Sequence, residues 1–93
     1  MPLLRLPTPL RPYANGQVEI QLQGKTIAQM MRELSDQYPQ LQPQLYGGDG
    51  QLRAFVHLFV NDEDMENLQG IDTPVGEEDR VMIIPSVAGG GSA

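Results

Sequence analysis

The sequence predicts a single α+β domain in which a mixed sheet wraps one main helix. Three observations predict it: two runs near the N-terminus that suit a β-hairpin, one apolar stripe at helical spacing, and two short apolar runs in the C-terminal half. Packing a helix on a sheet is the simplest way to bury all these faces together. We place the domain in residues 1–85 and expect the glycine-rich residues 86–93 to form a flexible tail.

The N-terminal part predicts a hairpin. Residues 3–6 are mostly leucine but lie among four prolines in residues 1–12, which favours an edge strand because proline is excluded from central strands. Asn15 and Gly16 then indicate a turn, since both residue types tolerate positive φ. Residues 18–22 alternate between apolar and polar side chains, as a half-buried strand does.

A helix is predicted to begin after Thr26. Thr26 and Gln29 fit a capping box, in which each side chain accepts a hydrogen bond from a free backbone N–H at the helix start. Pro39 should end this helix. Its apolar stripe is made of Ile27, Met30, Met31, Leu34 and Tyr38.

Residues 39–53 predict a long connection without regular structure, rich in Gln and Pro. Its glycine run at residues 47–50 has the composition of a phosphate-binding loop. Such a loop needs a lysine and a hydroxyl residue directly after its glycines, whereas Gln51 and Leu52 follow here. We therefore expect no phosphate site.

Two apolar runs predict the remaining strands. Residues 55–60 form the first, which Asn61 and Asp62 end. Residues 81–84 form the last strand, which Pro85 closes before the glycine-rich tail.

Composition narrows the functional classes. Twelve acidic and six basic residues give a net charge of −6, which argues against a nucleic-acid binder because such proteins need basic residues for phosphate contacts. The absence of cysteine removes disulfides, thiolate metal sites and cysteine nucleophiles. No apolar run is long enough to span a membrane and the N-terminus does not read as a secretory signal, so we expect a cytoplasmic protein.

The end of the chain resembles a known family. Residues 81–90 read as an apolar strand, a proline, a short apolar spacer and Gly-Gly, and this is similar to the end of the ThiS/MoaD family of ubiquitin-like sulfur carriers. Residues 60–64, Val-Asn-Asp-Glu-Asp, resemble the branch that serves cysteine biosynthesis. The resemblance covers residues 18–90 and implies a β-grasp (ubiquitin-like) fold.

The resemblance also implies a function that depends on the tail motif Gly89, Gly90 and Gly91. A ubiquitin-activating-type adenylyltransferase would use ATP and Mg to adenylate the carboxylate of Gly90, which then becomes a thiocarboxylate for sulfur transfer in cysteine or cofactor biosynthesis. The acceptor would be a synthase such as a cysteine synthase. The chain itself would hold no cofactor, no metal and no catalytic residue, so it would be a carrier and not an enzyme. Glycine suits such a tail because a Cβ would collide with the walls of a narrow channel.

One feature departs from the family pattern, because Gly91, Ser92 and Ala93 follow the Gly-Gly pair. Residues 91–93 would have to be removed, for which a JAMM-type metalloprotease is one candidate, or they are a cloning scar, or the chain is not a carrier. The functional pair is either Gly89-Gly90 or Gly90-Gly91. Three other functions stay open: the small subunit of molybdopterin synthase, a non-covalent ubiquitin-like interaction domain, and a protein modifier.

Strand alternation predicts a partner-binding surface beside the tail. If Val56, Leu58, Val60, Val81 and Ile83 face the helix, their neighbours point outward. The outward set, with one residue of the tail, forms an apolar patch of the kind that binds partners: Phe55, His57, Phe59, Met82, Ile84 and Val87. The alternative is that the N-terminal segment or the long connection covers this face.

The single histidine and the acidic stretches do not predict a metal site. His57 is the only histidine and has no cysteine to join it, so a plain sheet-surface residue is favoured over a zinc ligand or a catalytic triad. Residues 62–66 and 77–79 lack the spacing of a calcium loop. We interpret them as solvated turns, with docking to basic residues of an activating enzyme as the functional alternative.

Overall fold

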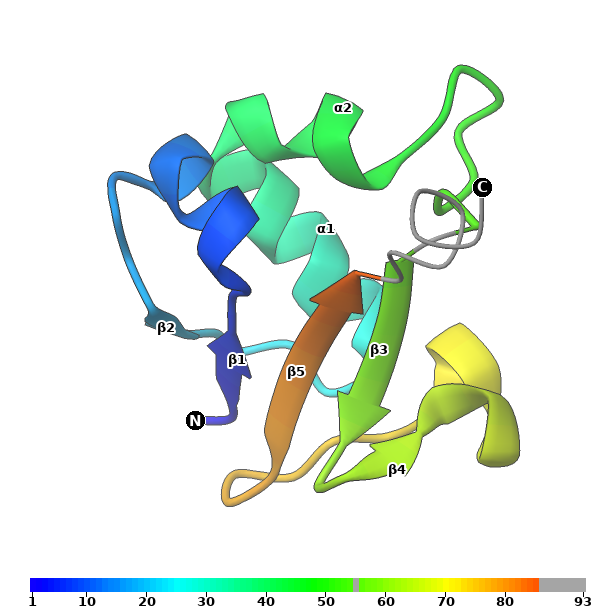
Figure 1. Ribbon diagram of the computed structural model, residues 1–93. Coiled ribbons are helices and arrows are strands. Elements are labelled where there is room, and N and C mark those ends of the chain that lie inside the picture. The colour runs from blue at the N-terminus through cyan, green and yellow to red at the C-terminus, as the bar shows by residue number, and fades with distance from the viewer. Residues whose placement is uncertain (55, 86–93) are drawn as a thin grey trace.

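The computed structural model of the chain describes residues 1–54 and 56–85 (Figure 1). Its strands form one mixed sheet in the order β2-β1-β5-β3-β4. β1 runs parallel to β5, and the other neighbouring strands are antiparallel. The strands are β1 Leu3–Arg5, β2 Glu19–Gln21, β3 Val56–Val60, β4 Glu63–Asp64 and β5 Arg80–Pro85. The predicted α+β architecture is confirmed.

β1 is an inner strand, so the predicted edge position is wrong. It lies between β2 and β5, with Leu4 opposite both Ile20 and Val81. The strand is only three residues long, and Pro2 and Pro7 both lie outside it. Neither proline therefore removes an N–H from the hydrogen-bond ladder, and the rule that keeps proline out of central strands is not broken.

The predicted N-terminal hairpin is confirmed, but its connection is longer than a tight turn. A 3₁₀ helix, η1 (Thr8–Ala14), follows β1 and carries the chain to Asn15 and Gly16. These two residues have φ of 57° and 80°, as expected of the predicted turn. Val18 precedes β2 and is 40% exposed, so the buried alternation begins only at Ile20.

The main helix, α1 (Ile27–Gln37), begins and ends as predicted. Thr26 Oγ1 accepts a hydrogen bond from the N–H of Gln29 at 3.1 Å, and Gln29 Oε1 accepts one from the N–H of Lys25 at 2.9 Å. These bonds confirm the capping box, with the return bond made to the residue before the N-cap. The buried stripe consists of Ile27, Met30, Met31 and Leu34.

The first half of the connection after α1 is helical, which corrects the prediction of a structureless segment. A 3₁₀ helix, η2 (Pro39–Leu41), runs directly into a short helix, α2 (Gln42–Leu45). Each begins with a proline in its first turn, where the missing N–H costs nothing. Leu41 and Leu45 are fully buried and anchor the segment to the core.

β3 and β4 form a tight hairpin. Asn61 and Asp62 make its turn with φ of 50° and 73°, and Val60 and Phe59 then pair with Glu63 and Asp64. Residues 63 and 64 therefore form a short edge strand, which the sequence did not predict. Two 3₁₀ helices, η3 (Met65–Asn67) and η4 (Gly70–Asp72), complete the crossing toward β5.

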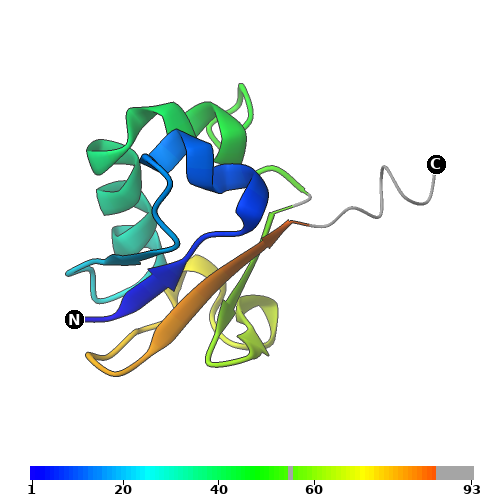
Figure 2. The same ribbon diagram turned by 60° about the vertical axis from the view of Figure 1, so that its left-hand side comes forward.

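The core lies between one face of the sheet and the helices. Figure 2 shows η1, α1 and α2 gathered on one side of β1 and β5. The inward residues of the strands are nearly inaccessible, as alternation predicted: Leu4, Ile20, Val56, Leu58, Val60, Val81 and Ile83. These helices do not cover the opposite face of the sheet.

Candidate functional site

Some of the predicted functional residues lie outside the described residues. They are the tail motif and two members of the expected patch: Gly89, Gly90, Gly91, Phe55 and Val87. Their roles in tail chemistry and partner binding, like the boundary between residues 1–85 and 86–93, therefore stay predictions.

The four described members of the patch are brought together on the outer face of the sheet. His57 lies directly opposite Ile84, and Phe59 directly opposite Met82, across the β3–β5 ladder. Directly opposed residues of a ladder share a face, and their side chains touch. Ile84 is 40% exposed and the other three are half-buried. The predicted apolar cluster therefore exists, at the end of β5 from which the tail departs.

β1 extends this outer face in a way that the sequence did not predict. Arg5 lies opposite Met82, and Leu3 lies opposite Arg80. We call the outward residues of the three inner strands the docking face: Leu3, Arg5, His57, Phe59, Arg80, Met82 and Ile84. The arginines were missed because the parallel pairing of β1 with β5 joins segments that are far apart in sequence.

A small hollow of about 280 Å³ lies where the docking face meets the start of η1. Arg5, Thr8 and Arg11 line it on one side, with Met82 and Ile84 on the other. The Nε of Arg11 donates a hydrogen bond to the carbonyl oxygen of Leu6 at 3.1 Å, which holds this side chain at the hollow. The hollow therefore offers aliphatic walls and two guanidinium groups beside the last residues of β5.

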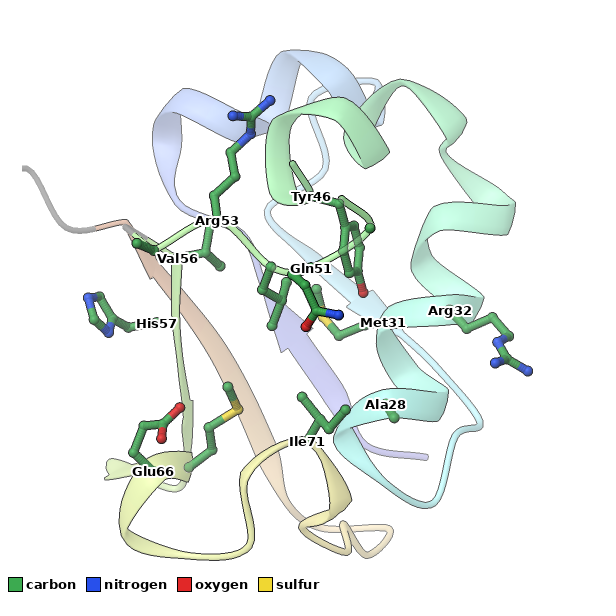
Figure 3. Close-up of a pocket in the computed structure, with 14 residues that line it drawn as sticks. Ala28, Met31, Arg32, Tyr46, Gln51, Arg53, Val56, His57, Glu66 and Ile71 are labelled. Atoms are coloured by element: carbon green, nitrogen blue, oxygen red, sulfur yellow. The ribbon is translucent and has the colours of Figure 1, made fainter. Parts of the chain in front are cut away.

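A larger cleft of about 590 Å³ lies between α1 and the other side of β3 (Figure 3). Tyr46, Met31 and Ile71 point into it, and His57 lines its edge with its ring turned away from these three side chains. Burial raises the pKa of the Tyr46 hydroxyl, and the positive charge of Arg32 offsets part of this rise. The mixed lining comes from α1, the loop before β3, η3 and η4, so no local pattern in the sequence could have indicated this cleft.

The acidic stretches lie mainly at exposed turns and hold backbone groups there. Asp64 accepts a hydrogen bond from the N–H of Glu66 at 2.8 Å. Asp79 accepts one from the N–H of Gly76 at 2.7 Å and one from the side-chain amide of Asn61 at 2.8 Å. The Gly76 bond first, and then the Asn61 bond, hold the pKa of Asp79 below its ordinary value of 3.8. These bonds give the carboxylates a local structural role at the turns.

Among residues 1–54 and 56–85, no three His, Asp or Glu side chains lie close enough together to hold a metal ion. His57 lies on the sheet surface opposite Ile84, where the sequence predicted it. None of the helices in this described part is both long and apolar enough to cross a membrane.

Comparison with known proteins gives the family. Residues 4–90 match the ThiS family. The sulfur carrier protein CysO of Mycobacterium tuberculosis is 36% identical over 87 residues, which cover 91% of this chain and 94% of that protein. A putative sulfur carrier protein of Archaeoglobus fulgidus is 32% identical over 87 residues, covering 94% of this chain and 96% of the relative.

Solved structures agree with the sequence matches. The crystal structure of M. tuberculosis CysO aligns with a TM-score of 0.83 at 31% identity, covering 94% of this chain and all of the other. One chain of the crystal structure of the Amycolatopsis orientalis BexX/CysO complex aligns with a TM-score of 0.85 at 25% identity, covering 95% of this chain and 98% of the other. These neighbours confirm the predicted β-grasp fold. The chain therefore belongs to the ThiS family.

Proposed function

We propose that this chain is a sulfur carrier of cysteine biosynthesis and that it works through the carboxylate of Gly90. The family match carries this proposal, because it begins at residue 4, covers the rest of the domain and stops at residue 90, the second glycine of the tail. Residues 91–93 lie beyond it. The similarity to CysO over nearly all of both chains points to the cysteine branch. The end of the family match at residue 90 favours Gly89-Gly90 over Gly90-Gly91 as the functional pair.

The proposed chemistry uses the tail as a substrate. A carboxylate oxygen of Gly90 attacks the α-phosphorus of ATP, which is bound with Mg in an adenylyltransferase, and pyrophosphate leaves. Sulfide (HS⁻) then attacks the acyl carbon, AMP leaves, the proton of the sulfide is released, and a thiocarboxylate remains. The partner enzyme supplies the metal, the nucleotide site and the proton transfers. The chain contributes a carboxylate and the surface that brings it to the enzyme, as a cytoplasmic carrier with access to ATP.

The fold supports a role in which this chain presents its tail and the partner enzyme performs the chemistry. β5 pairs with β1 over Arg80–Met82 and with β3 up to Pro85, so β3 holds the end of β5 from which the tail departs. The apolar centre of the docking face, Phe59 and Met82, lies on the same strand pair. An enzyme that covers this face would therefore receive the tail in a defined direction. The A. orientalis complex supports binding of a second protein by a relative of this fold.

The proposal requires that residues 91–93 are removed, because the carboxyl group of Gly90 is otherwise part of a peptide bond. A JAMM-type metalloprotease is the proposed maturing enzyme. A cysteine-synthase-type enzyme is the proposed sulfur acceptor, which follows from the similarity to CysO.

The test compares three forms of the chain, ending at Gly89, Gly90 and Ala93. Each is incubated with Mg-ATP, a sulfide source and a ubiquitin-activating-type adenylyltransferase from the same organism. Pyrophosphate exchange reports adenylation, and the intact mass reports replacement of one oxygen by sulfur. We expect both signals only for the form ending at Gly90. If that form is as inert as the other two, while the enzyme adenylates a different carrier of the same organism, the proposed function is wrong.

A further inference from the structure

We propose that the docking face binds an acidic partner surface, in which carboxylate side chains surround an apolar centre. The inference rests on the proposed function, because it describes the partner that receives the tail. This proposal differs from the alternative interface, in which the acidic turns of this chain would bind basic residues of an enzyme.

The docking face carries positive charge, whereas the chain as a whole carries a net negative charge. The protein carries a net charge of −6, but the docking face contains two arginines, one histidine, four apolar residues and no acidic residue. Acidic side chains share this side of the sheet only on the edge strands, where Glu19 lies opposite Arg5 and Asp64 lies opposite Phe59. The inner strands thus present a cationic and apolar strip.

The arginines of this strip are largely available for a partner. Within the described residues, the only carboxylate within 4.0 Å of any of them is Glu19, at 3.7 Å from Arg5. The side chains of that pair are 52% and 38% exposed, so water screens the attraction and the pair contributes little. Arg80 is exposed at the far end of the strip from the tail.

The hollow beside the end of β5 gives a carboxylate a place to bind. Its volume of about 280 Å³ is enough for a glutamate or aspartate side chain with its neighbouring backbone. The stem of such a side chain would contact Met82 and Ile84, and its carboxylate would lie between Arg5 and Arg11. Because a guanidinium binds a carboxylate through two parallel N–H groups, this arrangement also selects an orientation.

The acidic residues on the rest of the surface also favour binding of an acidic partner at the docking face. Asp62, Glu77 and Glu78 are exposed at the turns beside the Arg80 end of the docking face, which is the end far from the tail. A partner with an acidic surface is repelled from those turns and attracted only to the strip, so the long-range field guides it to the face from which the tail departs.

The test uses charge reversal on the chain ending at Gly90. Arg5→Glu, on the docking face, and Arg11→Glu, in the hollow at its edge, are the two docking-face variants. Arg32→Glu is the matched control, because α1 covers the opposite side of the sheet. The rate of association with the adenylyltransferase is measured by stopped flow at several salt concentrations. We expect each docking-face variant to associate about tenfold more slowly and with a weaker salt dependence, and the control to change by less than about twofold. Equal slowing by all three variants, or faster association of the docking-face variants, would overturn the inference.

A second measurement needs no activating enzyme, so it separates this inference from the proposed function. Amide signals of the labelled protein are followed by NMR during titration with the synthetic peptide acetyl-Glu-Leu-Asp-Leu-Glu-amide, and with its counterpart in which lysine replaces each acidic residue. We expect the acidic peptide alone to shift the signals of Arg5, Arg11, Met82 and Ile84, and Arg11→Glu to abolish the shifts. A preference for the lysine peptide, or no shift with either one, contradicts the inference. If no enzyme activates the chain but the acidic peptide binds, the proposed function fails and the acidic preference stands.

Discussion

Replacing Gly24 by alanine should destabilise the fold. Gly24 is buried where the chain passes from β2 to α1. A Cβ at this position would lie 2.5 Å from the backbone nitrogen of Met30 and 2.8 Å from the backbone carbon of Gln29. Both atoms belong to the first two turns of α1, so no flexible side-chain end can move aside. The connection must instead shift away from the helix.

The structure gives the size of the effect. Overpacking of a well-packed site costs about 1–3 kcal/mol. The shift also lengthens the hydrogen bonds that Glu33 Oε1 accepts from the N–H groups of Gln23 and Gly24, at 2.8 and 3.0 Å, and weakening a bond to a charged group costs about 1 kcal/mol. Alanine lowers the entropy of the unfolded chain, which offsets about 0.4–1 kcal/mol. The net loss in free energy of unfolding is about 1–3.6 kcal/mol, or about 4–29 °C in Tm for a domain of this size.

Urea and thermal unfolding followed by circular dichroism measure this loss. Gly48→Ala is the matched control, because a Cβ at Gly48 has no atom within 4 Å. We expect that variant to be as stable as the parent or slightly more stable. If Gly24→Ala and Gly48→Ala unfold at the same urea concentration, the close approach of the connection to α1 is not present in the protein and the reasoning is refuted.

Three other variants test the core, the helix cap and one carboxylate. Leu58→Ala should lower the free energy of unfolding by about 2–5 kcal/mol in urea titrations, because Leu58 is fully buried, whereas His57→Ala on the outer face of the same strand should change it by about 0.5 kcal/mol or less. Thr26→Ala should cost about 1 kcal/mol and Thr26→Ser much less, since serine keeps the capping oxygen; equal losses would contradict the cap. The pKa of Asp79 is lowered in the folded state, mainly by the Gly76 N–H, so its stabilisation is present above 3.8 and is lost as the pH falls through the folded pKa. Asp79→Asn should therefore lower the urea midpoint at neutral pH, and this difference should shrink on acidification below pH 3.8; a difference independent of pH would contradict the assignment.

The parts of the fold that depend on local patterns were predictable from the sequence. The cap at Thr26, the turn at Asn15 and the stop at Pro39 each depend on residues within one helical turn, and all three are present. The alternation along β3 and β5 also placed His57, Phe59, Met82 and Ile84 on one face without knowledge of the pairing. Hydrophobic periodicity and helix capping are properties of a short segment, so they can be recognised in a single sequence.

Features that depend on long-range pairing were not predictable in the same way. The position of β1 between β2 and β5 is set by contacts with Arg80 and Met82, which lie more than half the chain away. The prolines near β1 indicated an edge, because the rule used does not say how short a central strand can be. The same missing information hid Arg5, and with it the cationic character of the docking face. α2 is only four residues long, with one proline and one buried leucine, which is too short for a helical period to be recognised.

β5 links the stability of the domain to the reach of the tail. Its inward residues Val81 and Ile83 are buried in the core, and its outward residues Met82 and Ile84 belong to the docking face, so one strand holds both surfaces in a fixed relation. Gly90 lies six residues beyond Ile84. A fully extended chain covers at most about 3.3–3.6 Å per residue, so Gly90 can reach no farther than about 22 Å from the docking face. An enzyme that acts on Gly90 while bound to this face must therefore have its nucleotide site within that distance of its acidic contact surface. Lengthening the segment after Pro85 by a few glycines should weaken the coupling between docking and adenylation without changing the affinity of the docking face.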